Sequence, residues 1–147
     1  MSKRILKTLV AIVIVGIVLL VLIQFIPYGK DHSNPSVISE PTWNSQQTRD
    51  LAQAACFDCH SNETIWPWYS NIAPLSWLVY RDVVEGRRRL NFSDWQNSRF
   101  REPGELVHAV IEGEMPPLQY LPTHLSAWLS SAQKTQLADG LQKLTIP

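Results

Sequence analysis

Cysteine is scarce in this chain. Only Cys56 and Cys59 occur, and both fall within one five-residue stretch. The lack of further cysteines excludes the disulfide framework that staples many small secreted domains. A four-ligand zinc site would need two more ligands, and His108 and His124 lack the short spacing of a zinc finger. Extra stabilisation of a small domain would therefore have to come from a bound group.

An excess of either charge is also missing, since 13 Lys and Arg balance 13 Asp and Glu. Lys3, Arg4 and Lys7 account for three of the 13 cations, so the chain from Lys30 onward carries ten against 13 acidic residues, a net charge of −3. Nucleic-acid binding requires a basic face. The charge pattern therefore predicts no nucleic-acid partner.

Several other patterns are absent. No alternation of apolar and polar residues indicates a strand, and no internal repeat occurs. No paired catalytic carboxylates, Ser/His/Asp set or phosphate-binding loop stands out, which favours a binding or carrier protein over an enzyme. The fold class that remains is all-α with long loops. The predicted helices are Ser45–Ala55, Pro74–Leu90, Pro103–Glu112 and Ser131–Leu144, with a short helix capped by Ser93 and holding Trp95.

One long apolar run is present at the N-terminus. Ile5–Ile26 is long enough to cross a bilayer, which takes roughly 20 helical residues. The basic residues before it predict a cytoplasmic N-terminus and place everything after Tyr28 outside. The alternative, a cleaved signal peptide, requires small residues after the apolar core, where this chain has the bulky stretch from Gln24 to Tyr28. We therefore expect an uncleaved, single-pass anchor.

The two cysteines belong to Cys56-Phe57-Asp58-Cys59-His60, a C-x-x-C-H sequence. This is the attachment signature of a c-type haem, in which each thiol forms a thioether and the adjacent histidine binds the iron. A redox dithiol and a zinc site are the alternatives. Bacteria attach haem covalently outside the cytoplasmic membrane, so the anchor and the motif predict the same compartment.

A proximal His60 leaves a sixth iron position to be filled. Met115 follows a predicted helix end, within Gly113-Glu114-Met115-Pro116-Pro117, where prolines stiffen the loop. We expect it to be the distal ligand, although it could also merely fill a gap in the core. His108 and His124 are the rival sixth ligands. An open sixth site would instead indicate a gas-binding or peroxidatic haem.

Aromatic and basic clusters suggest further contacts with haem. Trp66, Trp68 and Tyr69 are near enough to His60 in sequence to shield the haem. The arginines at 87–89 are expected to end a helix in solvent, where one could pair with a propionate.

Longer stretches show a family resemblance. The segment Cys56–Trp95, CFDCHSNETIWPWYSNIAPLSWLVYRDVVEGRRRLNFSDW, resembles the bacterial haem-binding domain family of small c-type cytochrome-like proteins. The Met115 loop, Tyr120, His124 and Leu129-Ser130 agree with it, so that the resemblance covers about residues 44–147. It implies a cytochrome c-like helical fold, covalent haem through Cys56 and Cys59, a proximal His60 and a distal Met115.

The predicted organisation is an anchor over residues 1–28, a flexible linker over 29–43 and a haem domain over 44–147. We interpret the protein as a monohaem c-type cytochrome of the bacterial inner membrane, with its C-terminal domain in the periplasm, transferring single electrons between redox partners that the sequence does not identify. The alternatives are a haem-based sensor in which a ligand displaces Met115, and a dithiol protein without haem.

Overall fold

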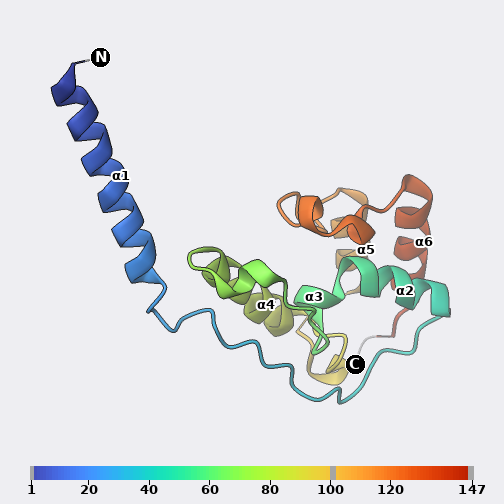
Figure 1. The fold of residues 1–147 in the computed structure, drawn as a ribbon. Coiled ribbons are helices and arrows are strands. Elements are labelled where there is room, and N and C mark those ends of the chain that lie inside the picture. Colours follow the sequence, from blue (N-terminus) through green and yellow to red (C-terminus); the bar gives the residue numbers. More distant parts are fainter. Residues whose placement is uncertain (1, 100–101, 146–147) are drawn as a thin grey trace. The chain divides into compact units, whose positions relative to one another are not determined.

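The computed structural model describes residues 2–99 and 102–145 (Figure 1). The described residues form helices and loops, with one isolated bridge between Ser39 and Asp94 and no strand. The all-α prediction is therefore confirmed. The chain divides into two compact units, one made of the chain up to His32 together with Trp66–Arg81, the other of Ser33–Ile65 and the chain from Asp82 onward.

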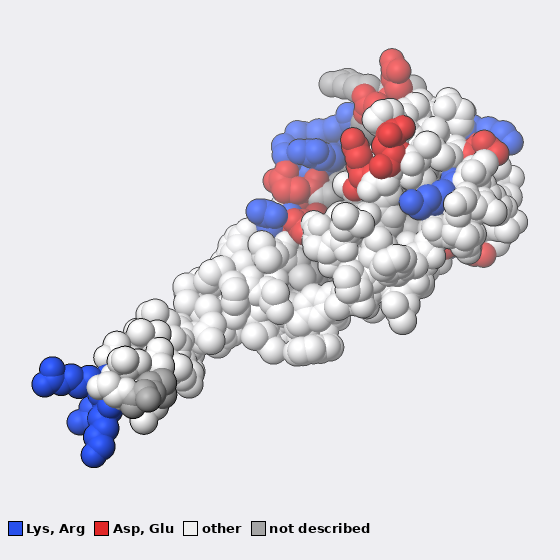
Figure 2. Space-filling model, turned by 90° about the horizontal axis from the view of Figure 1, so that it is seen from above, with Lys and Arg blue, Asp and Glu red and all other residues white. Residues whose placement is uncertain are grey.

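The first unit begins with helix α1, Lys3–Ile23, whose 21 residues form the single helix among the described residues that is long and apolar enough to cross a membrane. No residue of α1 is buried. Lys and Arg side chains gather at its N-terminal end, and the rest of the helix is uncharged (Figure 2). At 1.5 Å per residue α1 spans about 32 Å, close to the ~30 Å hydrocarbon layer of a bilayer. The sequence therefore predicted an apolar helix here correctly, although the helix runs from Lys3 to Ile23 and not from Ile5 to Ile26.

The second unit packs three helices around its core. These are α2 (Gln46–Ala55), α5 (Pro103–Ile111) and α6 (Ser131–Leu141), and α6 contacts both of the others. Their ends follow the local signals, since Ser45 caps α2 and Ser130 forms a capping box with Gln133. The buried core residues are Leu51, Ala52, Phe57, Leu90, Phe92, Trp95, Val110, Leu137, Leu141 and Leu144.

The remaining helices are α3 (Phe57–His60), α4 (Leu75–Arg89) and four short 3₁₀ turns. Helix α4 begins one residue after Pro74, in agreement with the prediction. The 3₁₀ turns are η1 (Trp68–Asn71), η2 (Trp95–Asn97), η3 (Leu121–Thr123) and η4 (Leu125–Ala127).

A predicted helix cap and a predicted helix end in the second unit differ from the structure. Asp94, rather than Ser93, precedes η2, because the buried Ser93 hydroxyl accepts a hydrogen bond from the Asn62 N–H instead. The last helix ends at Leu141, three residues before the predicted Leu144, which is nevertheless buried in the core.

The segment predicted as a flexible linker has no helix, but in the second unit it is held by hydrogen bonds. The amides of Ile38 and Ser39 donate to the Ser93 carbonyl at 2.8 and 3.1 Å. The Asn34 side chain donates to the Thr64 carbonyl at 2.9 Å. A chain tied at several points does not behave as a random-coil tether, so the free reach expected of a flexible linker is not available to residues 34–39.

Candidate functional site

The C-x-x-C-H motif forms the compact turn of α3. Cys56 precedes the helix, and the His60 amide donates to the Cys56 carbonyl at 2.9 Å. Phe57 points into the core, where its ring stacks on Phe92 with centroids 5.5 Å apart. The buried Phe57 ring therefore anchors the motif in the core, and no disulfide joins Cys56 and Cys59.

Burial raises the pKa of both Cys56 and Cys59 to about 12, and charge repulsion adds to this, from Cys59 on Cys56 and from Asp82 and Asp58 on Cys59. A redox-active dithiol needs a depressed pKa, because the thiolate is the reactive form. Zinc needs thiolates and further ligands, and no cluster of three His, Cys, Asp or Glu able to hold a metal occurs among residues 2–99 and 102–145. Neither a lowered thiol pKa nor a cluster of further ligands among the described residues therefore supports the dithiol or the zinc alternative.

The His60 ring is oriented by the end of α4. Its Nδ1 atom lies 3.1 Å from the Gly86 carbonyl oxygen and 3.2 Å from that of Leu90. Because a carbonyl oxygen can only accept, Nδ1 carries the proton and Nε2 keeps its lone pair. Burial also lowers the pKa of His60, which favours the neutral ring. A neutral histidine with a fixed tautomer is the form that ligates iron.

Gly86 allows α4 to approach the motif. A Cβ atom at this position would lie 2.3 Å from the Cys59 carbonyl oxygen and 2.9 Å from its carbon. Only glycine permits this contact, and the same residue supplies one of the two carbonyl oxygens that receive the His60 proton.

One cavity of about 450 Å³ is lined by Cys56, His60 and Met115 together. This volume is within the range of small-molecule and cofactor pockets, roughly 300–1,000 Å³. Cys59 is not among the lining residues, and its backbone lies against Gly86. The apolar wall consists of Ala55, Leu90, Phe92, Leu106, Ala109, Val110 and Leu141.

Met115 reaches the cavity from the loop after α5. Gly113 ends the helix with a φ of 75°, and the Met115 amide donates to the Ala109 carbonyl at 2.9 Å. The side chain is 38% exposed, so it is a cavity wall rather than a buried gap-filler. A thioether and an imidazole that line one apolar cavity fit the two axial positions of a haem iron.

Three arginines line the same cavity, Arg88, Arg89 and Arg99. Guanidinium groups bind carboxylates such as the two propionates of a haem. Arg87 is used elsewhere, because its side chain donates to the Ser61 carbonyl and the Asn34 side chain at 2.7 Å each. Within residues 87–89 the hypothesis of a propionate partner is thereby restricted to Arg89 and to Arg88, which also donates to the Glu85 carboxylate, with Arg99 a further candidate.

The rival ligands lie outside the cavity, among the residues that the structure describes. His108 is exposed on α5, and His124 stacks on the Tyr120 ring with centroids 3.7 Å apart. The aromatic residues Trp66 and Trp68 belong to the other compact unit and do not line the cavity either, nor does Tyr69. No contact within the second unit therefore supports the prediction that these three residues shield the haem.

Sequence reasoning missed one contact within the motif. The Asp58 carboxylate accepts hydrogen bonds from the Tyr120 hydroxyl at 2.6 Å and from the Ile65 amide at 2.9 Å. Asp58 thus connects the C-x-x-C-H turn with the segment that follows Met115. Its position between the two cysteines offered no local signal of a partner 62 residues away.

The Tyr120→Phe variant tests this connection. Loss of the hydroxyl should lower the free energy of unfolding by ~1–2 kcal/mol, somewhat less than for a fully buried hydrogen bond to a charged group. Burial, and then the bond to Asp58, raises the pKa of Tyr120 above its usual value of 10.0. The unfolded chain therefore loses this proton first, and the stability that Tyr120 contributes is full below pH 10.0 and declines above it. The difference in free energy of unfolding between the two proteins, measured with urea, should become smaller above that pH. A difference that does not depend on pH would contradict the assignment.

Comparison with known proteins identifies the family. The family model described as a haem-binding domain matches residues 18–143. No curated protein and no solved structure shows significant similarity to the chain. The family match covers most of the chain, including the C-x-x-C-H turn, the Met115 loop and the cavity that they line, and the protein therefore belongs to the haem-binding domain family.

Proposed function

We propose that this protein is a membrane-anchored monohaem c-type cytochrome that carries single electrons on the periplasmic face of the bacterial inner membrane. A bound haem supplies a one-electron ferric/ferrous couple. The observation that carries the proposal is the cavity lined by Cys56, His60 and Met115.

Cys56 and Cys59 would hold the haem as two thioethers. They form no disulfide, and the Cys59 amide donates to the Cys56 carbonyl at 3.2 Å, which holds the two residues in one turn. Covalent attachment suits a domain of this size, because a group bonded to the chain cannot dissociate and so acts as a staple.

His60 would be the proximal ligand through Nε2. The carbonyl oxygens of Gly86 and Leu90 hold its Nδ1 proton, which fixes the ring and makes the free nitrogen a better donor to iron. Met115 would be the distal ligand. A thioether favours the ferrous state, so this pair is expected to give a relatively high reduction potential.

Helix α1 supports the membrane part of the proposal. Its basic N-terminal end predicts insertion with the N-terminus in the cytoplasm. The haem domain would then face the periplasm, where the cell attaches haem to such motifs.

A haem-based sensor is the second candidate function. It would use the same cavity, since a small molecule that enters it can compete with the Met115 thioether for the sixth iron position. In this case the neutral His60 would keep its role, and Met115 would act as the displaceable group.

Spectroscopy of the full-length chain, matured in a periplasm and held in detergent, separates the two functions. The electron carrier should show a ferrous c-type spectrum, a single one-electron potentiometric transition and no rapid change on addition of carbon monoxide. Rapid carbon monoxide binding to the unmutated ferrous protein would contradict the carrier and support the sensor.

A further inference from the structure

A second uncharged region lies outside the haem cavity. The segment between Glu63 and Arg81 contains no Lys, Arg, Asp or Glu. It holds three of the six tryptophans and two of the four tyrosines: Trp66, Trp68, Trp77, Tyr69 and Tyr80. None of them lines the cavity. This concentration of aromatic residues belongs to the unit that contains α1.

Residues 66–81, which we call the aromatic segment, belong to the same compact unit as α1. The side-chain amide of Gln24, just after α1, donates to the Ala73 carbonyl and accepts from the Ala73 amide, both at 2.9 Å. A Cβ atom on Gly29 would lie 2.7 Å from the Ser76 carbonyl oxygen, and Gly29 has a φ of 79°. The chain that leaves α1 is thus in direct backbone contact with the aromatic segment.

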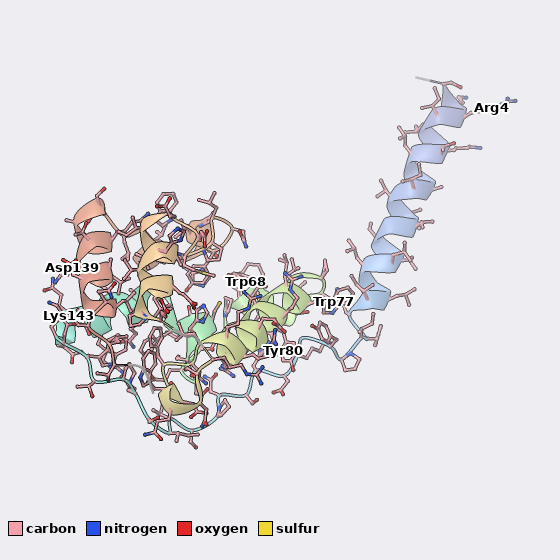
Figure 3. The ribbon with its side chains drawn as sticks, turned by 180° about the vertical axis from the view of Figure 1, so that it is seen from behind. Arg4, Trp68, Trp77, Tyr80, Asp139 and Lys143 are labelled. Atoms are coloured by element: carbon pink, nitrogen blue, oxygen red, sulfur yellow. The ribbon has the colours of Figure 1, made fainter. Side chains whose placement is uncertain are left out.

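Ring contacts reinforce this attachment. His32 stacks on Trp66 with centroids 4.4 Å apart, and the His32 Nε2 atom lies 3.0 Å from the Ser70 carbonyl oxygen. Tyr28 and Tyr80 meet edge to face at 5.4 Å. Figure 3 shows Trp77 beside the end of α1 that is opposite Arg4.

The unit leaves large apolar side chains in contact with solvent. Trp68 is 75% exposed and Phe25 is 80% exposed. Further exposed side chains on the same unit are Ile26, Tyr28, Ile72, Leu75 and Leu78. Several large apolar side chains exposed on one unit are typical of a protein or membrane contact.

We infer that the aromatic segment is a membrane-surface element that lies in the headgroup layer where α1 leaves the bilayer. Tryptophan and tyrosine concentrate at this level because their rings are apolar while their N–H and O–H groups can bond to water and headgroups. The segment is attached to the non-basic end of α1, where the bilayer surface must lie if α1 spans it. The inference thus rests on the anchor in the proposed function.

This arrangement has a consequence for the haem domain. Helix α4 starts within the aromatic segment and continues to Arg89, next to the Leu90 carbonyl that holds His60. The chain therefore passes from the proposed membrane-surface element into the haem domain within one helix.

Spin labels on the full, haem-loaded chain in vesicles of phosphatidylcholine and phosphatidylglycerol test the inference. Single labels are placed through Trp68→Cys in the aromatic segment, Val15→Cys in the middle of α1 and Asp139→Cys on the exposed face of α6 (Figure 3 shows Trp68 and Asp139). The chain without an added cysteine is the labelling blank. Each variant must retain the haem spectrum of the unmodified protein, which shows that it has folded.

We expect position 15 to be deep in the bilayer and position 68 to be at headgroup depth. The label at 68 should collide with a water-soluble nickel chelate several-fold less often than the label at 139. If the label at position 15 is deep in the bilayer while the label at position 68 collides with the chelate as often as the label at position 139, the membrane-surface element is contradicted. The proposed membrane anchor is not contradicted by that result. If the label at position 15 is itself accessible to the chelate, the proposed membrane anchor is contradicted, and the membrane-surface element is contradicted with it.

Discussion

The Gly86→Ala variant is expected to accumulate little haem-loaded protein and to unfold at a much lower urea concentration. The added Cβ would lie 2.3 Å from the Cys59 carbonyl oxygen, which is a backbone atom and cannot rotate away. Overpacking costs about 1–3 kcal/mol, and more where backbone must move. Movement of α4 would also displace the Gly86 carbonyl that orients His60. Haem content per chain and the urea midpoint measure the effect.

Gly104→Ala is the matched control. Gly104 also lies in a helix, α5, but a Cβ atom added there would meet no described residue beyond its own helical turn within 4 Å. Alanine is favoured over glycine in helices by up to ~1 kcal/mol, so this variant should keep its haem and be as stable as the unmodified protein or slightly more so. Equal haem content and equal urea midpoints in the two alanine variants would contradict the packing of α4 on the C-x-x-C-H turn.

The Met115→Ala variant should keep its haem but lose the thioether ligand. The weak far-red absorption band of ferric haem that is diagnostic of thioether ligation should disappear. Because His/Met ligation raises the potential, the reduction potential should fall by a tenth or more of the ~0.8 V range that axial ligands set. Carbon monoxide should bind rapidly to the ferrous variant, since the sixth position is no longer filled by the chain.

Leu118→Ala provides the comparison for this change. Leu118 lies in the same loop and is 77% exposed, but it does not line the cavity. Removal of the Leu118 side chain should leave the far-red thioether band and the reduction potential unchanged. Persistence of the thioether band in Met115→Ala would show that the distal assignment is wrong.

Local signals in the sequence predicted most helix ends correctly. Ser45 caps α2, Gly113 ends α5 with a positive φ, and Ser130 with Gln133 forms the box before α6. Such ends depend on hydrogen bonds within a few residues, and for this reason they can be read without knowledge of the fold. Ser93 could have capped a helix as Ser45 does, but its hydroxyl accepts a hydrogen bond from the Asn62 amide, which is distant in sequence.

The parts of the site that depend on distant contacts could not be predicted. Gly86 is an isolated glycine within a helical pattern, and such a glycine often has a packing role. The residue that it contacts in space, Cys59, is 27 residues away in the sequence, so the sequence did not identify this contact. The Tyr120–Asp58 bond spans 62 residues. Nothing in the sequence indicated that Trp66 and Trp68 share a unit with α1 rather than with the haem cavity.

Residues 29–43 show how composition can mislead. Polar residues and prolines indicate a lack of regular structure, and here that interpretation is correct. Flexibility does not follow from it, because backbone groups of Ile38 and Ser39 bond to Ser93 and the Asn34 side chain bonds to Thr64. An irregular segment can be fixed by partners that only the fold brings near.

Mass spectrometry of the denatured protein, produced in a periplasm that attaches haem, tests the central claim most directly. We expect the intact chain to carry the mass of one haem that resists extraction by acid and organic solvent, and the peptide that contains Cys56 and Cys59 to carry it through both sulfur atoms. A chain of unmodified mass, with all haem extracted, would contradict covalent attachment and with it the assignment as a c-type cytochrome.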